Sequence, residues 1–246
     1  VPLLVTAGAD VNLPTKAEAK AIRGGGSRTP LMYAIQKEAV TRTLLKSALQ
    51  INAVDAKNWS ALMHAIDECS SSSKVKIVEL LLRKGADVGL ANSDGNTALH
   101  LAVKEYEASD LVPILQAAKA DFNAANRAGE TPLMLCRDVK TMELLIEHGA
   151  GVDVADKAGK TALTHSVNGW ATNALPAAKF LLSVKANPNI QDSEGKTALM
   201  IASRADDLLK TVRLLVEHGA DLDLLDKSGC SASAHASPEN LKFLIA

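Results

Sequence analysis

One short pattern recurs along the chain, and it constrains the fold more than any other feature. A Thr or Ser, then Ala or Pro, then Leu returns at steps of 31, 37, 34, 30, 36 and 34 residues. Such a period is typical of repeat architectures, in which each unit buries its apolar face only by stacking on its neighbours. We call the first residue of each copy the anchor. The anchors are Thr29, Ser60, Thr97, Thr131, Thr161, Thr197 and Ser231, and the last copy has Ser233 in place of Leu.

Each anchor predicts the start of a short helix that packs closely on another. The anchor hydroxyl can cap the helix, and Pro30 and Pro132 stand at the first helical position, where no N–H is needed. A second apolar run follows and usually ends in Gly-Ala-Asp, as a helix with its C-cap does. The residue five places after each anchor is always small, as a close helix contact requires: Ala34, Ala65, Ala102, Cys136, Ser166, Ala202 and Ala236.

A turn of constant length joins each second helix to the next anchor, and we call this segment the finger. Two residues before the anchor stands Gly, or Asn58 in one finger, which suits a positive φ. Five residues before the anchor stands Asp or Asn, whose side chain can bond the backbone of the turn. These residues are Asp55, Asn92, Asn126, Asp156, Asp192 and Asp226. Lys119, Lys185 and Ala48 replace the C-cap glycine and are expected to adopt left-handed φ.

These residues resemble the ankyrin repeat, whose T-P-L-H-x-A signature and G-A-D-V-N-x-x-D-x-x-G tail are matched at Gly85–Val88, Asn92–Ala102 and Asp192–Ala202. The resemblance implies an all-α solenoid of stacked helix-turn-helix units with projecting β-hairpin or turn fingers. The family's His at the fourth motif position survives only as His100, and Met, Thr or Ala replaces it in the other copies. The hydrogen bond of that His to the finger backbone is therefore expected to be absent in most repeats.

The pattern predicts a single array over residues 1–246. Residues 1–12 form a partial N-terminal repeat, 13–28 an enlarged first finger, 29–230 six repeats and 231–246 a degenerate C-terminal repeat. The enlarged finger is either a tolerated insertion or a contact element for a partner. Because the chain opens in the tail of a repeat, we expect it to be a fragment of a longer protein.

Composition excludes several classes of function. The formal net charge is −1, which gives no broad positive field for nucleic acid. The three cysteines have no C-x-x-C spacing, so neither a disulfide framework nor a zinc knuckle is expected, and an intracellular location, cytoplasmic or nuclear, fits best. No apolar stretch approaches the length of a membrane span.

Candidate chemical sites were sought among the histidines, glycines and acidic pairs. His64, His165 and His235 each follow the family's His position by one residue, but they lie in different repeats, so no shared metal site is expected. Gly24–Gly26 lacks the Lys-Ser/Thr of a phosphate-binding loop. The pair Asp67-Glu68 is expected at solvent-facing turn positions. We therefore predict no enzyme activity, no cofactor and no metal.

The leading interpretation is a monomeric scaffold that binds another protein through its fingertips and concave helical face. The alternatives are a regulatory or substrate-docking segment of a larger enzyme, such as a kinase or acyltransferase, and a structural spacer. Trp59 stands at a fingertip among polar residues, as a binding anchor or as a ring folded over an adjacent finger. The fingertips are rich in basic residues, which would suit an acidic partner segment or form an ordinary solvated face. The candidate partner-binding residues are Trp59, Lys57, Arg127, Lys157, Lys160, Lys196 and Lys227.

Overall fold

The computed structural model describes residues 28–47, 50–104, 108–169 and 174–245. The chain divides into two compact units, residues 1–121 and 122–246. The partial N-terminal repeat, nearly all of the enlarged first finger and Ala48 lie outside the described residues. The division into one array with these boundaries therefore stays a prediction.

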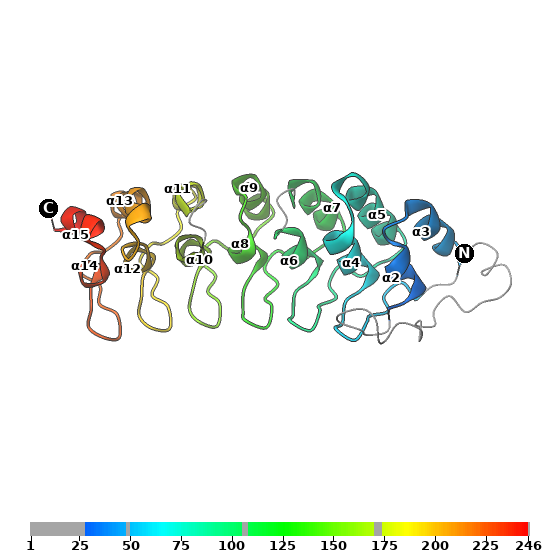
Figure 1. The fold of residues 1–246 in the computed structure, drawn as a ribbon, viewed down its shortest axis with the longest axis horizontal. Coiled ribbons are helices and arrows are strands. Elements are labelled where there is room, and N and C mark those ends of the chain that lie inside the picture. The colour runs from blue at the N-terminus through cyan, green and yellow to red at the C-terminus, as the bar shows by residue number, and fades with distance from the viewer. Residues whose placement is uncertain (1–27, 48–49, 105–107, 170–173, 246) are drawn as a thin grey trace. The chain divides into compact units, whose positions relative to one another are not determined.

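Unit 1 consists of helix pairs, each made of a first helix after an anchor and a second helix that returns antiparallel to it. Fingers project from the side of the first helices (Figure 1). The second helix α5 is the longest in this unit, because it begins within the Ser70–Ser73 run. The elements are α2 (Pro30–Ala34), α3 (Glu38–Leu44), α4 (Ala61–Glu68), α5 (Ser71–Arg83), α6 (Ala98–Ala102), the 3-10 turn η2 (Ala108–Asp110) and α7 (Val112–Ala117).

Unit 2 repeats this arrangement with four helix pairs among its described residues. Its first helices form one layer, its second helices form another, and its fingers project on one side (Figure 1). The elements are α8 (Pro132–Leu135), α9 (Val139–Glu147), α10 (Ala162–Gly169), α11 (Ala174–Ser183), α12 (Ala198–Ala202), η3 (Asp206–Leu208), α13 (Leu209–Glu217), α14 (Ala232–His235) and α15 (Pro238–Leu244).

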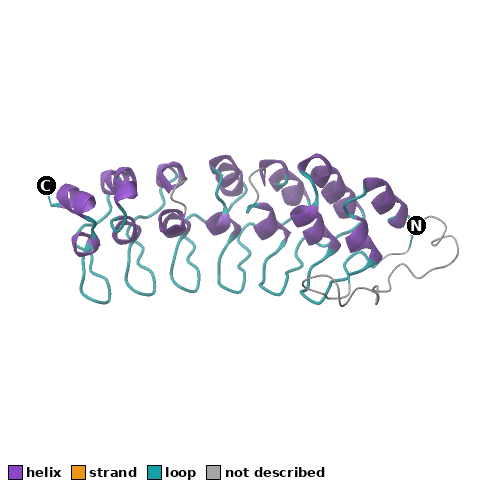
Figure 2. Cartoon of the chain, viewed as in Figure 1, coloured by secondary structure: helices purple, strands orange, loops and turns teal. Residues whose placement is uncertain are grey.

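The described part of the chain contains no strand, which confirms the all-α fold (Figure 2). Two fingers of unit 1 each hold one isolated antiparallel bridge, Val54 with Ser60 and Ala91 with Thr97. The fingers are thus hydrogen-bonded turns rather than β-hairpins. No described helix has the length and apolar character needed to cross a membrane.

Several anchors cap their first helices as the sequence predicts, whereas Ser231 makes no side-chain cap bond. The hydroxyls of Thr29, Ser60 and Thr197 accept hydrogen bonds from the backbone N–H three residues later. His100 Nδ1 accepts the N–H of its own anchor at 3.1 Å. In two repeats the sulfur of Met32 or Met134 accepts the anchor N–H instead, at 3.4 Å, so the anchor donor there has an acceptor without a His.

The small residues five places after the anchors lie at the helix contacts. Ala65, Ala102 and Cys136 have 0% of their surface exposed. Burial raises the pKa of the Cys136 thiol to about 12, so this thiol stays protonated and serves as a packing group.

The second helices end in left-handed residues whether or not glycine is present. Lys119 and Lys185 have φ of 64° and 66°, and Gly149 and Gly219 have φ of 92° and 83°. At Lys185 the N–H of the following Ala186 bonds the carbonyl of Leu181, which completes a Schellman-type cap. The sequence prediction for both lysines is confirmed.

Replacing Lys185 by Gly should stabilise the protein. The left-handed conformation strains a side chain with a Cβ, so the change is expected to raise the free energy of unfolding by about 0.5 to 1 kcal/mol. Urea unfolding of the full chain measures it. As a control, Lys179→Gly inside α11 should lower the same quantity by about 1 kcal/mol. If Lys185→Gly instead lowers the free energy of unfolding, the contacts of the Lys185 side chain stabilise the protein by more than its left-handed backbone destabilises it.

Candidate functional site

A side-chain oxygen of one Asp or Asn accepts two backbone hydrogen bonds in each finger from Asp55 onward. Oδ1 of the Asp or Asn five residues before the anchor accepts the backbone N–H groups two and four residues later. In the finger of Asp156 these bonds measure 2.8 Å to Ala158 and 2.9 Å to Lys160. The same pair recurs at Asp55, Asn92, Asn126, Asp192 and Asp226. The structural role predicted for these residues is confirmed.

Neighbouring fingers are joined through their backbones. The N–H four residues before one anchor donates to the carbonyl three residues before the preceding anchor. In unit 1 Ser93 donates to Lys57 at 2.9 Å. In unit 2 Lys157 donates to Ala128 at 3.0 Å, Ser193 to Ala158 at 2.7 Å and Lys227 to Glu194 at 3.0 Å. Within each unit the fingertips are therefore held at fixed spacing.

A second set of links between repeats escaped the sequence analysis. The side-chain oxygen of Asn52 accepts the N–H of Asp87 at 2.8 Å, and its amide donates to the carbonyl of Gly85 at 3.2 Å. Asn123 and Asn189 make the same two bonds to the next helix end. The available signal was the Asn in the F-N pair after Ala120-Asp121 and in the P-N pair after Ala186-Asn187.

Trp59 packs within its own repeat. Its side chain is half-buried, and the centroid of its ring lies 5.3 Å from that of His64. The backbone N–H of Trp59 donates to Asp55 Oδ1 at 2.9 Å. The partner-binding role of Trp59 stays a prediction, and the two rings are tilted by 37° to each other. Lys57, two residues earlier, is exposed.

The buried His64 lies between two carboxylates. Its Nε2 is 3.0 Å from Asp55 Oδ2, and its Nδ1 is 2.9 Å from Glu68 Oε1. Arg28 binds the same Glu68 through both of its terminal nitrogens. Burial raises the pKa of Glu68, but hydrogen bonds from Arg28 and His64 outweigh it, so the pKa lies below its usual range. Glu68 ends helix α4 and is half-buried, so its prediction as a solvent-facing turn residue was wrong.

A polar pocket of about 250 Å³ opens beside this cluster in unit 1. Its lining includes four acidic and two basic side chains together with Trp59 and His64. The surroundings of Trp59 are therefore more acidic than the fingertip sequence alone suggests.

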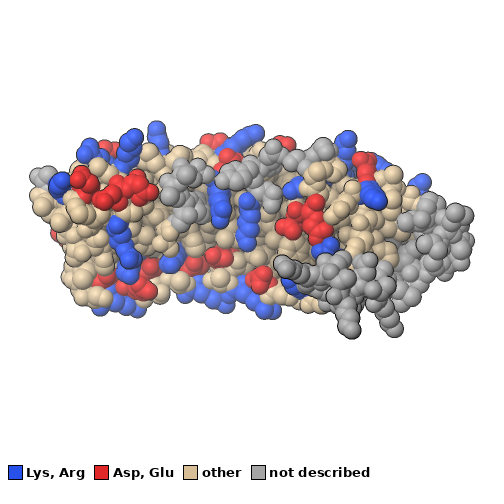
Figure 3. Space-filling model, in the orientation of Figure 1, with Lys and Arg blue, Asp and Glu red and all other residues tan. Residues whose placement is uncertain are grey.

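The basic residues of unit 2 lie along its finger side. Arg127, Lys157 and Lys227 are exposed, whereas Lys160 and Lys196 are half-buried. Lys196 forms an ion pair with Glu194 at 2.6 Å. In Figure 3 blue atoms follow the lower edge of this unit, where the fingers project, with red atoms between them and the helices. The basic fingertip row is present, but Lys196 contributes less positive field than its neighbours because of its acidic partner.

Three histidines are bonded to the finger carboxylates. Nε2 of His165 and His235 lies 2.8 Å and 2.7 Å from Oδ2 of Asp156 and Asp226, in the same relation as His64 to Asp55. Hydrogen bonds lower the pKa of Asp226, although its burial acts in the opposite direction. The bond from the backbone N–H of Cys230 has the largest effect, and those from His235 and Ser228 add to it. The sequence analysis missed this link, whose signal is a His nine residues after the Asp.

Two groups in unit 2 bring metal-binding atom types together. The donor atoms of each group lie within 4.8 Å of one another. One group is Asp226, Cys230 and His235, and the other is Glu130, Asp156 and His165. Each group takes its histidine and aspartate from one repeat, an arrangement that the sequence argument about separate repeats did not consider.

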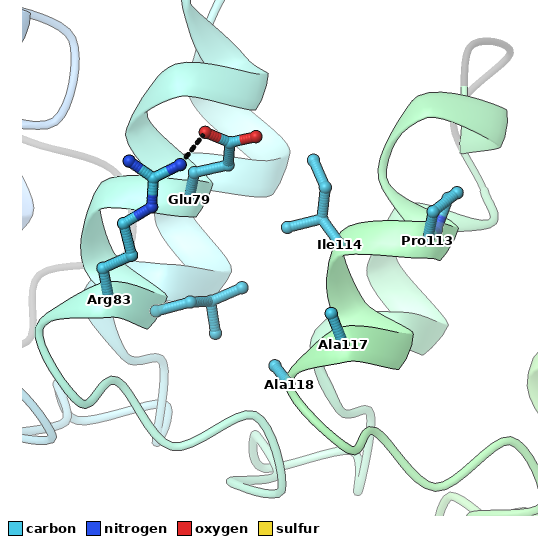
Figure 4. A pocket seen from close by; sticks show the side chains of 7 residues that line it. Glu79, Arg83, Pro113, Ile114, Ala117 and Ala118 are labelled. Carbon is cyan, nitrogen blue, oxygen red and sulfur yellow. Dashed lines mark hydrogen bonds and ion pairs between the residues drawn. The ribbon is translucent and has the colours of Figure 1, made fainter.

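Unit 1 also has an apolar pocket of about 450 Å³, which lies between the second helices α5 and α7. Ile114, Ala117 and Ala118 face Leu82 across it, and the Glu79–Arg83 ion pair borders it (Figure 4). The small side chains of α7 leave this space open.

This geometry defines a helical repeat protein whose rigid finger rows present variable side chains. A family model described as ankyrin repeats in three copies matches residues 1–92, 99–192 and 170–246. The chain belongs to the ankyrin-repeat family. Ankyrin repeats are in general protein–protein interaction modules.

Curated relatives agree with this assignment. The B-cell lymphoma 3 protein homolog of Mus musculus is 36% identical over 155 residues, which cover 60% of this chain and 34% of the relative. The putative ankyrin repeat protein L86 of Acanthamoeba polyphaga mimivirus is 31% identical over 182 residues, 69% of this chain and 28% of the relative. The chain thus spans about a third of the length of these relatives.

Two solved structures are similar in fold. The ankyrin repeat domain of Bcl-3, a member of the IkappaB protein family, matches with a TM-score of 0.75 and 26% identity, over 90% of this chain and 99% of that one. The human ASB11 ankyrin repeat domain matches with a TM-score of 0.73 and 23% identity, over 89% and 97% of the two chains.

Proposed function

We propose that this chain is a scaffold that holds a partner protein through its fingertips and the adjoining first helices. The observation that carries the proposal is the row of fingers fixed by backbone hydrogen bonds, with exposed side chains at the tips. Fixed spacing lowers the conformational cost of binding, because the surface is already ordered. The chain acts as a monomer inside the cell and carries out no catalysis of its own.

The partner presents an acidic segment to unit 2. Lys157 and Lys160 come from the finger before Thr161, and Lys227 comes from the finger before Ser231. Lys196, which pairs with Glu194, lies on the finger between them. With Lys196 included, the lysines occupy three successive fingers, and charges on adjacent fingers act together over a Debye length of about 8 Å at physiological salt. Such a row steers an oppositely charged partner and raises its association rate.

Reversing the charge of Lys157, Lys160 and Lys227 to glutamate should weaken partner binding at least about tenfold, and the wild-type affinity should fall with added salt. The measurement is quantitative pull-down from a cell extract, followed by titration of the captured protein. The control is the same reversal at Lys140, Lys179 and Lys210, exposed lysines of the second helices, which should leave binding unchanged. Salt-independent binding that survives the reversal at the fingertips would contradict the acidic partner.

Trp59→Ala should weaken partner binding by about 2 kcal/mol, as expected for an aromatic hot spot. The loss of its stack on His64 should lower the free energy of unfolding by about 1 kcal/mol or less. Both quantities are measured on the same purified variant. A stability loss with unchanged affinity would identify the ring as a packing element only. Trp59→Phe, which retains an aromatic face, should recover most of the stability.

A second candidate function is a regulatory or substrate-docking segment of a larger enzyme. The favouring observation is that the curated relatives are about three times longer than the matched region. Sequencing the complete coding region tests it, because a catalytic domain in the same chain would favour docking over free scaffolding.

A further inference from the structure

The C-terminal finger brings together three different donor atoms. Asp226 Oδ2 lies 2.7 Å from His235 Nε2. The Cys230 sulfur lies within 4.8 Å of one carboxylate oxygen of Asp226 and of one ring nitrogen of His235. Oxygen, nitrogen and thiolate sulfur are the donors that zinc takes in proteins, and three protein ligands plus water make an open zinc site. All three residues belong to one segment of the chain, from the finger to the short helix α14.

The protein fold already orients these donors. Oδ1 of Asp226 accepts the N–H groups of Ser228 at 2.8 Å and of Cys230 at 3.0 Å. One carboxylate therefore fixes the loop that carries the thiol, while its other oxygen holds the imidazole. The Asp226 side chain is 2% exposed and that of His235 is 21% exposed, so the site is anchored in the repeat and reachable from solvent. Hydrogen-bonded ligands of this kind bind metal more tightly than free ones.

The related repeats show what is distinct about this one. Asp55–His64 and Asp156–His165 form the same pair, but the position of Cys230 is taken by Trp59 and Lys160. Glu130 approaches the second pair and gives a group with no sulfur. Among the described repeats, the thiol is combined with the Asp–His pair only in the C-terminal finger.

We propose that Asp226, Cys230 and His235 bind one zinc ion. The sulfur loses its proton to solvent, and the imidazole proton moves from Nε2 to Nδ1, so that Nε2 and one oxygen of Asp226 face the metal. Water completes the tetrahedron. Histidines of different repeats are not expected to share a metal, whereas this site takes one histidine and two partners from the same repeat. The ion cross-links the finger to α14.

Titration of the full chain with Co²⁺ under reducing conditions tests the proposal, since thiolate ligation gives a charge-transfer absorption band that nitrogen and oxygen ligands lack. We expect the band to saturate at one equivalent and to be displaced by Zn²⁺. Cys230→Ser should abolish it, and His235→Gln should weaken metal affinity by at least about 100-fold, more than the loss of an outer-shell partner does.

The chain supplies matched controls. Cys69→Ser and Cys136→Ser should retain the band, because both thiols are buried away from this finger. Lys160→Cys should create a second site with Asp156 and His165 and raise the saturation to two equivalents. A band that is absent from the wild-type protein, or that survives Cys230→Ser, would overturn the proposal. Circular dichroism confirms that each variant is folded.

Discussion

Replacing Gly195 by alanine is expected to lower the free energy of unfolding by about 3 kcal/mol, whereas the same change at Gly229 should cost about 1 kcal/mol. The two glycines occupy the same finger position with nearly equal φ, 78° and 76°. A Cβ on Gly195 would lie 2.8 Å from the backbone N of Lys227 in the next finger, whereas a Cβ on Gly229 would meet no atom within 4 Å. The difference between the variants thus isolates the contact between fingers.

Urea unfolding of both variants, followed by circular dichroism, measures this difference. Gly159→Ala should resemble Gly195→Ala, because its Cβ would lie 2.8 Å from the N of Ser193. Equal losses at Gly195 and Gly229 would mean that adjacent fingers do not pack as closely as described here.

Asp156→Ala should lower the free energy of unfolding by about 3 kcal/mol. The substitution removes the carboxylate that accepts two backbone N–H groups and that bonds His165. The N–H groups of Ala158 and Lys160 lose their acceptor, and His165 loses its carboxylate. Thermal and urea unfolding measure the loss.

Two further variants divide this effect. Asp156→Asn should cost less than Asp156→Ala, because Asn92 and Asn126 hold the same backbone bonds in their own fingers. His165→Ala should cost about 1 kcal/mol, since it removes one hydrogen bond and leaves the turn intact. If Asp156→Ala is no worse than His165→Ala, the finger does not depend on this carboxylate for its structure.

The fold could be predicted from the sequence because its determinants are local. Capping by Ser60, the positive φ of Asn58 and the turn bonds of Asp55 each involve residues within a few positions of one another. The recurrence of the same signals in successive copies then fixes the stacking, since each copy must bury an equivalent face. The positive φ of Lys119 and Lys185 could be predicted because both lysines occupy the position at which other repeats have the C-cap glycine.

The candidate site was less predictable, because it depends on which side chains meet. The fingertip pattern gave the position of Trp59 but not its stack on His64, and it gave Lys196 without its ion pair to Glu194. The His–Asp bond joins residues nine apart, a separation that is neither a helical nor a strand period, and it closes only when the finger folds back on the first helix. Comparing the residues at equivalent positions of the repeats therefore does not reveal that the His and the Asp are in contact.

The recurring backbone bonds between neighbouring fingers join N–H and C=O groups, and the donors include both Ser93 and Lys157. Any side chain that tolerates the local backbone can therefore occupy these positions without weakening the link. The backbone atoms of these residues hold the fingers together, and their side chains are left to contact a partner. Substitutions at the fingertips can therefore change which partner the chain binds while the bonds between the fingers are preserved. For the same reason, fingertip residues could be exchanged by design.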